Sequence, residues 1–136
     1  MKKFTVQKKY ILSDGYRMKM LILQPKKRPA GGSPGVLWIH GGGFATGMAE
    51  MAYFSRVRNL VEEHGAVAIC PEYRLSFREP YPAAVKDCYR ALLYMKRHAE
   101  EYGIRTDQLM VGGESADGGL TVAVCLYARD HRHICL

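Results

Sequence analysis

The sequence predicts an α/β fold with a mostly parallel sheet, an N-terminal antiparallel hairpin and helices on both faces. Two observations carry this prediction. Short apolar runs bounded by glycine alternate with longer segments of helical periodicity, and two strand-like segments flank a turn near the start of the chain. Alternating strands and helices favour a parallel sheet, because parallel neighbours need a crossover connection. The length of 136 residues suits a single domain, residues 1–136.

The hairpin comes first. Residues 3–11 and 17–24 are predicted as strands, and the turn sequence Ser13-Asp14-Gly15 separates them. A polar loop rich in proline and glycine follows over residues 25–35. The apolar run 36–39 then predicts the first buried strand, because it is short and bounded by glycines.

Helices and strands alternate in the remainder. Helical spacing of apolar residues predicts a helix over 50–64, and a buried strand follows at 66–70. A second helix is predicted over 82–102, with Val85, Cys88, Leu92 and Met95 as its inner stripe. The third buried strand is predicted at 108–112 and the third helix at 116–129. This last helix is apolar nearly all round, which predicts burial on both sides.

Composition is that of an ordinary globular protein, with 48% hydrophobic and 24% charged residues. No apolar run approaches the ~18 residues that cross a bilayer. The start of the chain is basic but has no apolar stretch behind it, so a secretory signal is not expected. We therefore expect a cytoplasmic protein with no membrane partner.

The four cysteines are predicted to be reduced thiols, most of them buried: Cys70, Cys88, Cys125 and Cys135. None forms a C-x-x-C pair, and three lie in apolar segments. His131 and His133 are close in sequence but lack partners at metal-site spacing. No metal or organic cofactor is expected.

The basic residues gather at the start of the chain. Residues 1–28 hold nine Lys and Arg and one acid, a net charge of +8, whereas the rest of the chain has a net charge of −1. A basic stripe can bind nucleic acid. Lysine is also common on edge strands, where it discourages pairing with other chains. We favour the second interpretation and expect no nucleic-acid partner.

The first chemical motif is Gly113-Glu114-Ser115, which lies between a predicted strand and a predicted helix. This is the context of a nucleophile elbow, a sharp turn that holds a serine hydroxyl clear of the sheet. Small flanking residues are needed because the backbone passes close to itself. The helix N-terminus below the serine favours developing negative charge.

The second motif is the run 40–44, His40-Gly41-Gly42-Gly43-Phe44, directly after the strand 36–39. Three glycines leave backbone N–H groups free to point at a ligand, and such groups can form an oxyanion hole. Two alternatives are a flexible glycine loop and a phosphate cradle. The phosphate alternative is weak, because neither G-x-x-x-x-G-K-[ST] nor G-x-G-x-x-G is present.

Together these motifs resemble the hormone-sensitive-lipase-like branch of the α/β-hydrolase esterases and lipases, which includes bacterial acetyl esterases. The resemblance spans residues 15–129. It also rests on Tyr73-Arg74-Leu75, Tyr81-Pro82-Ala83-Ala84 and Asp87. It implies the N-terminal part of an α/β-hydrolase fold and a Ser–Asp–His hydrolase of short acyl esters.

The resemblance also implies residue roles. Ser115 would be the nucleophile, and the N–H groups of Gly42, Gly43 and Ala116 would form the oxyanion hole. His40 would shape the glycine loop together with Gly41, and Gly113, Glu114 and Asp117 would support the elbow. Tyr73, Arg74 and Asp87 would brace the loop between the second buried strand and the next helix.

The sequence departs from the family pattern in two places. Asp117 occupies the position where G-x-S-x-G expects glycine, so a carboxylate lies near the nucleophile. Beyond it, the candidate acids and bases after Ser115 are Asp130, His131 and His133. Asp130 and His131 lie at the far end of the helix that starts near Ser115, too distant to activate it. We therefore expect a truncated domain without the later strands that carry the catalytic acid and base.

Two other function classes are weighed against the esterase. The first is a non-catalytic binding or assembly module derived from the same fold, and the second is a nucleic-acid binder that uses the basic N-terminus. Ester turnover compared with Ser115→Ala separates the first alternative from the esterase, and salt-dependent retention on DNA would reveal the second. We also expect homo-oligomers, formed through the sheet edge 108–112 and the helix 116–129, both left uncovered.

Overall fold

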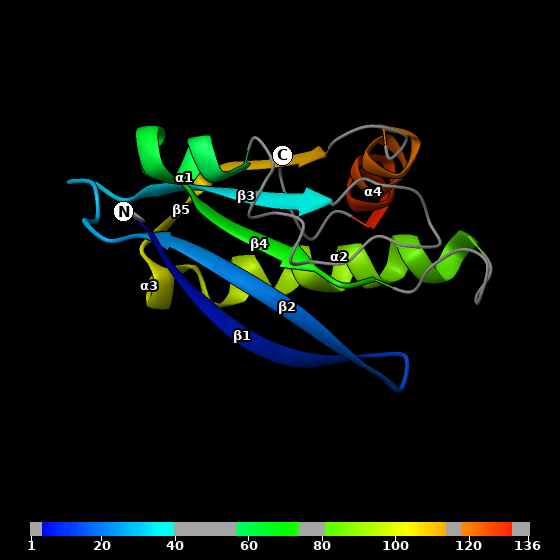
Figure 1. The fold of residues 1–136 in the computed structure, drawn as a ribbon. Helices are drawn as coiled ribbons and strands as arrows, with labels where there is room; N and C mark the ends of the chain where they lie inside the picture. The colour runs from blue at the N-terminus through cyan, green and yellow to red at the C-terminus, as the bar shows by residue number, and fades with distance from the viewer. Residues whose placement is uncertain (1–3, 40–56, 74–80, 114–117, 132–136) are drawn as a thin grey trace.

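The structure is a computed structural model that describes residues 4–39, 57–73, 81–113 and 118–131 (Figure 1). Five strands form one sheet in the order β1-β2-β4-β3-β5. Their bounds are β1 Phe4–Ser13, β2 Tyr16–Pro25, β3 Ser33–Ile39, β4 Val67–Pro71 and β5 Ile104–Gly113. The β1–β2 and β2–β4 pairs are antiparallel, and β3 pairs in parallel with both β4 and β5. The predicted hairpin and parallel strands are thus confirmed within one mixed sheet.

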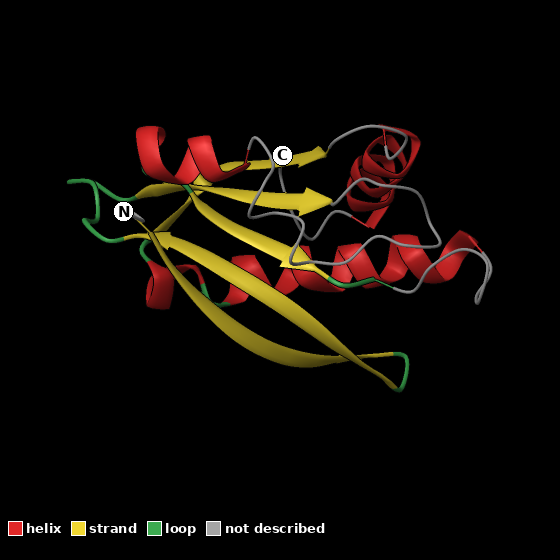
Figure 2. Cartoon of the chain, in the orientation of Figure 1, coloured by secondary structure: helices red, strands yellow, loops and turns green. Residues whose placement is uncertain are grey.

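Helices cover both faces of this sheet, as predicted (Figure 2). Their bounds are α1 Val57–His64, α2 Tyr81–Arg97, α3 Ala99–Tyr102 and α4 Gly118–His131. The larger core lies between the sheet and α2, and also takes in α3 and α4. The smaller core packs α1 against the other face, where Val57 and Val61 meet Leu21 and Trp38.

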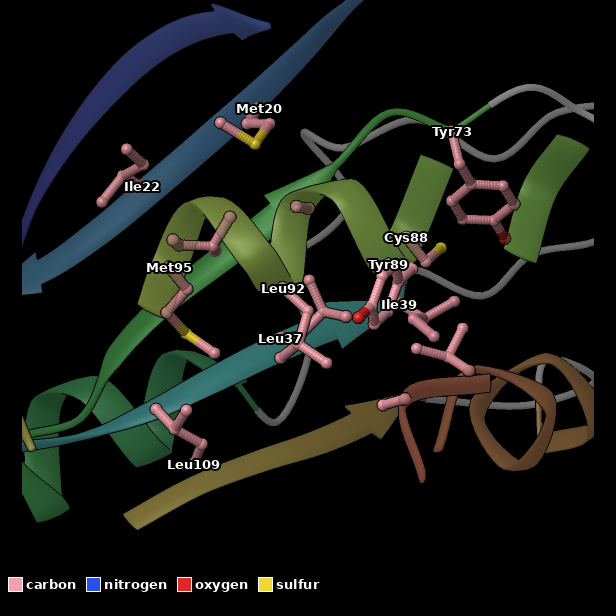
Figure 3. Packing of buried hydrophobic residues seen from close by; sticks show 14 of the residues in the cluster. Met20, Ile22, Leu37, Ile39, Tyr73, Cys88, Tyr89, Leu92, Met95 and Leu109 are labelled. Atoms are coloured by element: carbon pink, nitrogen blue, oxygen red, sulfur yellow. The ribbon is translucent and has the colours of Figure 1, made fainter. Parts of the chain in front are cut away.

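The larger core follows the periodicity of its elements. Leu37 of β3 points toward Leu92 and Met95 of α2 in Figure 3, and all three side chains are fully buried. The predicted inner stripe of α2 is confirmed, because Val85 and Cys88 are buried with them. Pro82 stands in the first turn of α2, where its missing N–H removes no helical hydrogen bond.

The hairpin turn has the backbone that its residues favour. Ser13 and Tyr16 pair directly, so the loop consists of Asp14 and Gly15 alone. Both have positive φ, 49° and 82°. Positive φ at both central positions is the geometry of a type I′ turn, which matches the twist of the two strands and favours Asp-Gly.

Several element boundaries differ from the prediction. The strand predicted at 36–39 begins at Ser33, within the segment predicted as a loop. The helix predicted over 82–102 is interrupted at His98, and a left-handed Gly103 ends α3. The strand predicted at 108–112 begins at Ile104 instead. Its first part was not recognised because Arg105, Thr106 and Asp107 are polar, but these residues are exposed at the sheet edge, where polar side chains cost little.

Within the described residues, no helix is long and apolar enough to span a membrane. The predicted helix 50–64 is seen from Val57 onward, and the predicted helix 116–129 from Gly118 onward; the earlier parts of both lie outside the described residues. Cys70, Cys88 and Cys125 are free thiols, and Cys135 also lies outside the described residues.

Candidate functional site

The two predicted motifs begin at neighbouring strand ends. Trp38 pairs with Gly112, and Ile39 pairs with Gly113, in the parallel ladder between β3 and β5. Parallel strands end at the same edge of a sheet, so residue 40 and residue 114 both leave the sheet at its carboxyl edge. Ligands of open α/β sheets bind at this edge.

Most of the predicted site residues lie outside the described residues. These are His40, Gly41, Gly42, Gly43, Glu114, Ser115, Ala116 and Asp117. Gly113 is described and is the last residue of β5. The structure therefore places the strands that lead into both motifs and the helix that follows the second.

The elements around Ser115 have the order that a nucleophile elbow requires. β5 ends two residues before the serine, and α4 begins three residues after it, at Gly118. A strand, a short connection and a helix are the context in which a G-x-S sequence indicates a nucleophile.

A close contact explains why glycine stands just before the elbow. A Cβ at Gly112 would lie 3.1 Å from Cζ3 of the Trp38 ring on the neighbouring strand. Trp38 is 6% exposed, and its indole Nε1 has no hydrogen-bond partner in the described part of the chain. The indole packs against β5 at Gly112, one residue pair before the ladder ends and the two motifs begin. Glycine at 112 leaves room for the ring.

The segment after β4 is tied to the hairpin at the same edge. The backbone N–H of Glu72 donates to the carbonyl oxygen of Lys19 at 2.8 Å, and the Tyr16 hydroxyl donates to the carbonyl oxygen of Glu72 at 3.0 Å. Lys19 Nζ also lies 3.8 Å from Glu72 Oε2. These contacts fix the direction in which the chain leaves β4, beside the end of β3.

Asp87 on α2 is buried and bonded to the hairpin. Its Oδ1 accepts a hydrogen bond of 2.6 Å from the Ser13 hydroxyl, and both residues are 0% exposed. The sequence predicted a bracing role for Asp87, but Ser13 was missed as its partner. Seventy-four residues separate the two, and no local pattern links them. Tyr73 is buried in the larger core, and Arg74 lies outside the described residues.

The described histidines do not reach the carboxyl edge. His64 ends α1 just before β4 begins, and His98 comes shortly before β5 begins, so both lie toward the amino edge. His131 is the last residue of α4, thirteen residues beyond Gly118, or about 20 Å along the helix. Asp130 is exposed and lies 3.3 Å from Arg129. A catalytic base must lie within about 3 Å of the hydroxyl it activates, so none of these groups fits that role.

The described residues hold no group of three His, Cys, Asp or Glu side chains arranged to bind a metal ion. Burial raises the pKa of the Cys70 thiol well above its ordinary value. Burial also raises the pKa of Cys125 on α4. Neither thiol has the lowered pKa of a catalytic cysteine.

The chain is similar to known hydrolases over much of its length. A family model described as "alpha/beta hydrolase fold" matches residues 36–136. The "Carboxylic ester hydrolase LipN" of Mycobacterium tuberculosis is 36% identical over 106 residues, which are 76% of this chain and 28% of that protein. An "AB hydrolase superfamily protein" of Schizosaccharomyces pombe is 35% identical over 96 residues, 71% of this chain and 28% of that protein.

Solved structures give the same result. The "Bacterial Heroin Esterase" superposes with a TM-score of 0.89 and 38% sequence identity, over 98% of this chain and 42% of that one. A "Structure of arylesterase" superposes with a TM-score of 0.84 and 30% identity, over 94% and 42%. The chain thus spans less than half the length of the relatives it matches.

Proposed function

The chain belongs to the α/β-hydrolase family, and on that premise we propose that it carries the nucleophile side of a serine carboxylesterase site for short acyl esters. The observation that carries the proposal is the parallel pairing of Ile39 with Gly113. This pairing starts the glycine run and the G-x-S sequence from adjacent strand ends. Relatives named as carboxylic ester hydrolase and arylesterase support the reaction class.

In the proposed reaction, the Ser115 hydroxyl oxygen attacks the ester carbonyl carbon. Negative charge then develops on the carbonyl oxygen, and the backbone N–H groups of Gly42, Gly43 and Ala116 would stabilise it. The bond to the alcohol then breaks, the alcohol leaves with the proton from the serine hydroxyl, and an acyl group remains on Ser115. Water adds to the acyl carbon, the carboxylic acid leaves, and the serine oxygen regains a proton. Within this scheme His40 and Gly41 shape the glycine run, and Glu114 and Asp117 flank the nucleophile.

The proposal includes slow ester hydrolysis by this 136-residue chain when it acts alone. Asp130 and His131 lie at the end of α4, about 20 Å along the helix from its start, and this separation supports a site without its own base and orienting acid. Loss of triad members leaves roughly 10³–10⁴-fold catalysis over water from the oxyanion hole and binding. Asp117 adds to this deficit, because a nearby negative charge opposes both the serine alkoxide and the oxyanion.

Hydrolysis of p-nitrophenyl acetate tests the proposal, with Ser115→Ala and Ser33→Ala compared side by side. We expect slow hydrolysis that Ser115→Ala abolishes and that Ser33→Ala retains, because Ser33 lies at the start of β3, far from the motifs. Equal rates in all three proteins would contradict a nucleophile at Ser115 and favour the non-catalytic binding module. A fast rate lost in Ser115→Ala would contradict the missing base and point to one supplied by another subunit.

We also propose a cytoplasmic location, supported by cysteine chemistry. Cys70 and Cys88 are buried, and with Cys125 they are free thiols. Reduced cysteines are usual where glutathione and thioredoxin keep thiols reduced. Fractionation of cells that express the chain tests this location, and recovery outside the cytoplasmic fraction would refute it.

Self-association through β5 and α4 is a further part of the proposal. In the described structure β5 has β3 as its one sheet neighbour, and Met110 and Leu126 are 48% and 44% exposed. The part 108–112 of this edge strand carries no charge, and an uncharged strand edge beside apolar side chains favours pairing with a second copy. Light scattering during size-exclusion chromatography should show dimers that Met110→Lys weakens. A monodisperse monomer at tens of micromolar would refute this interface.

A further inference from the structure

The β1–β2 hairpin projects beyond the strand on which it is docked. β2 pairs with β4 over Met20–Leu23 only, and Met20 faces Pro71, the last residue of β4. The two hairpin strands continue to pair with each other as far as Ser13 and Tyr16. The projecting end therefore lies at the carboxyl edge, the edge from which both motifs leave the sheet. Figure 1 shows this turn at the end of the sheet away from α1.

One face of the projecting end is attached to α2. Ser13 donates to buried Asp87, and Arg90 lies 3.6 Å from Asp14. Met18 and Met20 are buried in the larger core on the same side. These contacts hold the hairpin as a rigid extension of the sheet.

The opposite face of the projecting end forms what we call the hairpin patch: Lys8, Tyr10 and Leu12 of β1 with Arg17 and Lys19 of β2. Tyr10 faces Lys19 and Leu12 faces Arg17 across the strand pair. Leu12 is 70% exposed and Tyr10 is 47% exposed, half of the four large apolar side chains that are exposed in the described chain. The Arg17 guanidinium lies 4.1 Å from the centre of the Tyr10 ring.

Edge protection does not account for this patch. Lysine at position 8 discourages pairing with another strand, as is common on edges. An apolar Leu12 and an aromatic Tyr10 on the same edge strand have the opposite effect, and α2 packs on the other face. Apolar and aromatic side chains interleaved with cations are typical of surfaces that lie at a lipid–water interface.

We propose that the hairpin patch binds an anionic phospholipid surface. Leu12 and Tyr10 would enter the interface, while the exposed Lys8 and Arg17 contact lipid phosphates; Lys19 stays beside Glu72. Leu12 favours lipid over nucleic acid, because a nucleic acid offers phosphates and stacking faces but no apolar layer. The surplus of +8 in residues 1–28 adds attraction to an anionic surface. The proposal departs from the expectation of no membrane partner, since contact at a surface needs no membrane-spanning helix.

The position of the patch has a consequence for orientation. The turn residues Asp14 and Gly15 and the ends of β3 and β5 share the carboxyl edge, so docking on the patch brings that edge close to the lipid surface. The binding itself does not depend on catalysis. It therefore stands or falls separately from the proposed esterase function.

Co-sedimentation with vesicles tests the proposal on the full chain. We compare phosphatidylcholine vesicles with vesicles rich in phosphatidylglycerol, and expect binding to the second kind only. Leu12→Ser and Arg17→Gln should each weaken this binding about fivefold, from the lost apolar contact and the lost charge near the surface. Lys86→Gln is the matched control for charge, because it removes an exposed lysine from α2, and Leu12→Ile is the control for Leu12→Ser, because it keeps an apolar side chain in the patch.

Three results would overturn the proposal. The first is no difference between the two kinds of vesicle. The second is an equal loss in Lys86→Gln and Arg17→Gln, which would indicate a response to net charge alone. The third is retention on DNA, lost in Arg17→Gln, without vesicle binding. Equal urea midpoints for all variants establish that each still folds, as expected for exposed positions.

Discussion

The hydrogen bond between Ser13 and Asp87 joins the hairpin to α2, and removing it should destabilise the protein more than the same change at another buried serine. The bond is 2.6 Å long and both residues are 0% exposed. Removing one partner of a buried hydrogen bond costs roughly 1–3 kcal/mol, and a bond this short and fully buried belongs toward the upper end of that range. We therefore expect Ser13→Ala to lower the free energy of unfolding by about 2–3 kcal/mol.

Ser33 provides a matched control for this change. It is 1% exposed, and its hydroxyl has no hydrogen-bond partner within the described structure. The backbone N–H of Ser33 donates to the carbonyl oxygen of Gly103, and alanine keeps that bond. Ser33→Ala removes a buried hydroxyl without breaking a bond, so we expect a change between zero and a stabilisation of about 1 kcal/mol.

Urea unfolding followed by circular dichroism measures both substitutions. With a slope of about 1–3 kcal/mol per molar urea, Ser13→Ala should lower the midpoint by about 1 M. A double-mutant cycle with Asp87→Ala should show that the two changes are not additive, with a coupling of about 1–2 kcal/mol. Equal costs at Ser13 and Ser33, or an additive cycle, would refute the assigned role of this bond.

Three further predictions concern the core, the alkaline limit of stability and the elbow. Gly35→Ala should destabilise by about 1–3 kcal/mol in urea unfolding through overpacking, because its Cβ would lie 2.7 Å from Ile104 Cγ2 and 2.9 Å from Leu109 Cδ2; an unchanged midpoint would contradict this. Burial raises the pKa of Cys70 above its ordinary value of 9.0, so the thiol deprotonates at a lower pH in the unfolded chain than in the folded protein. The free energy of unfolding therefore keeps the full contribution of this thiol below pH 9 and falls as the pH rises further. Cys70→Ala should flatten that fall by up to about 1.4 kcal/mol per pH unit, and an equally steep decline would contradict the assignment. Asp117→Gly should raise the thermal midpoint by relieving the steric and charge conflict of the elbow, although glycine costs about 1 kcal/mol in a helix; a lower midpoint would show that the aspartate caps the helix.

The sequence predicts this fold well where both sides of an element are buried. The runs 36–39 and 66–70 are predicted as strands because they are short and apolar. All of their residues except Ala66 lie in β3 or β4, and these residues are buried. Prediction is poorer where tertiary contacts decide the conformation. The first part of β5 is polar yet extended: Ile104 pairs with Ser33 and Leu109 with Gly35 of β3, and the register shifts across the polar residues between them. His98 interrupts the predicted second helix, and no glycine or proline at this position predicts the break from the sequence.

The candidate site shows the same division. The glycine run and the G-x-S sequence are local patterns, and the sequence contains all of their residues. Their proximity is a property of strand order, which places β5 beside β3 and leaves β4 on the other side. Ser13 could not be found from sequence, because a serine before an Asp-Gly turn has a sufficient local explanation as a turn residue. Only the packing of α2 against the hairpin reveals that it is a buried donor.

The amino and carboxyl edges of the sheet differ in the contacts that hold them. At the amino edge, hydrogen bonds to backbone carbonyl groups connect the segments. The Ser33 N–H donates to the carbonyl oxygen of Gly103, and the Arg28 guanidinium donates to the carbonyl oxygen of Glu101. At the carboxyl edge, the hairpin is bonded to Glu72 and Asp87, while β3 and β5 end side by side. If the hairpin were loosened, the direction of the chain after β4 would therefore change first. β4 is the neighbour of β3, the strand that leads into the glycine run, so β3 would be affected next. Rigid attachment of the hairpin thus serves both proposals, since it holds the patch in a fixed direction and supports the strand ends from which the proposed catalytic loops begin.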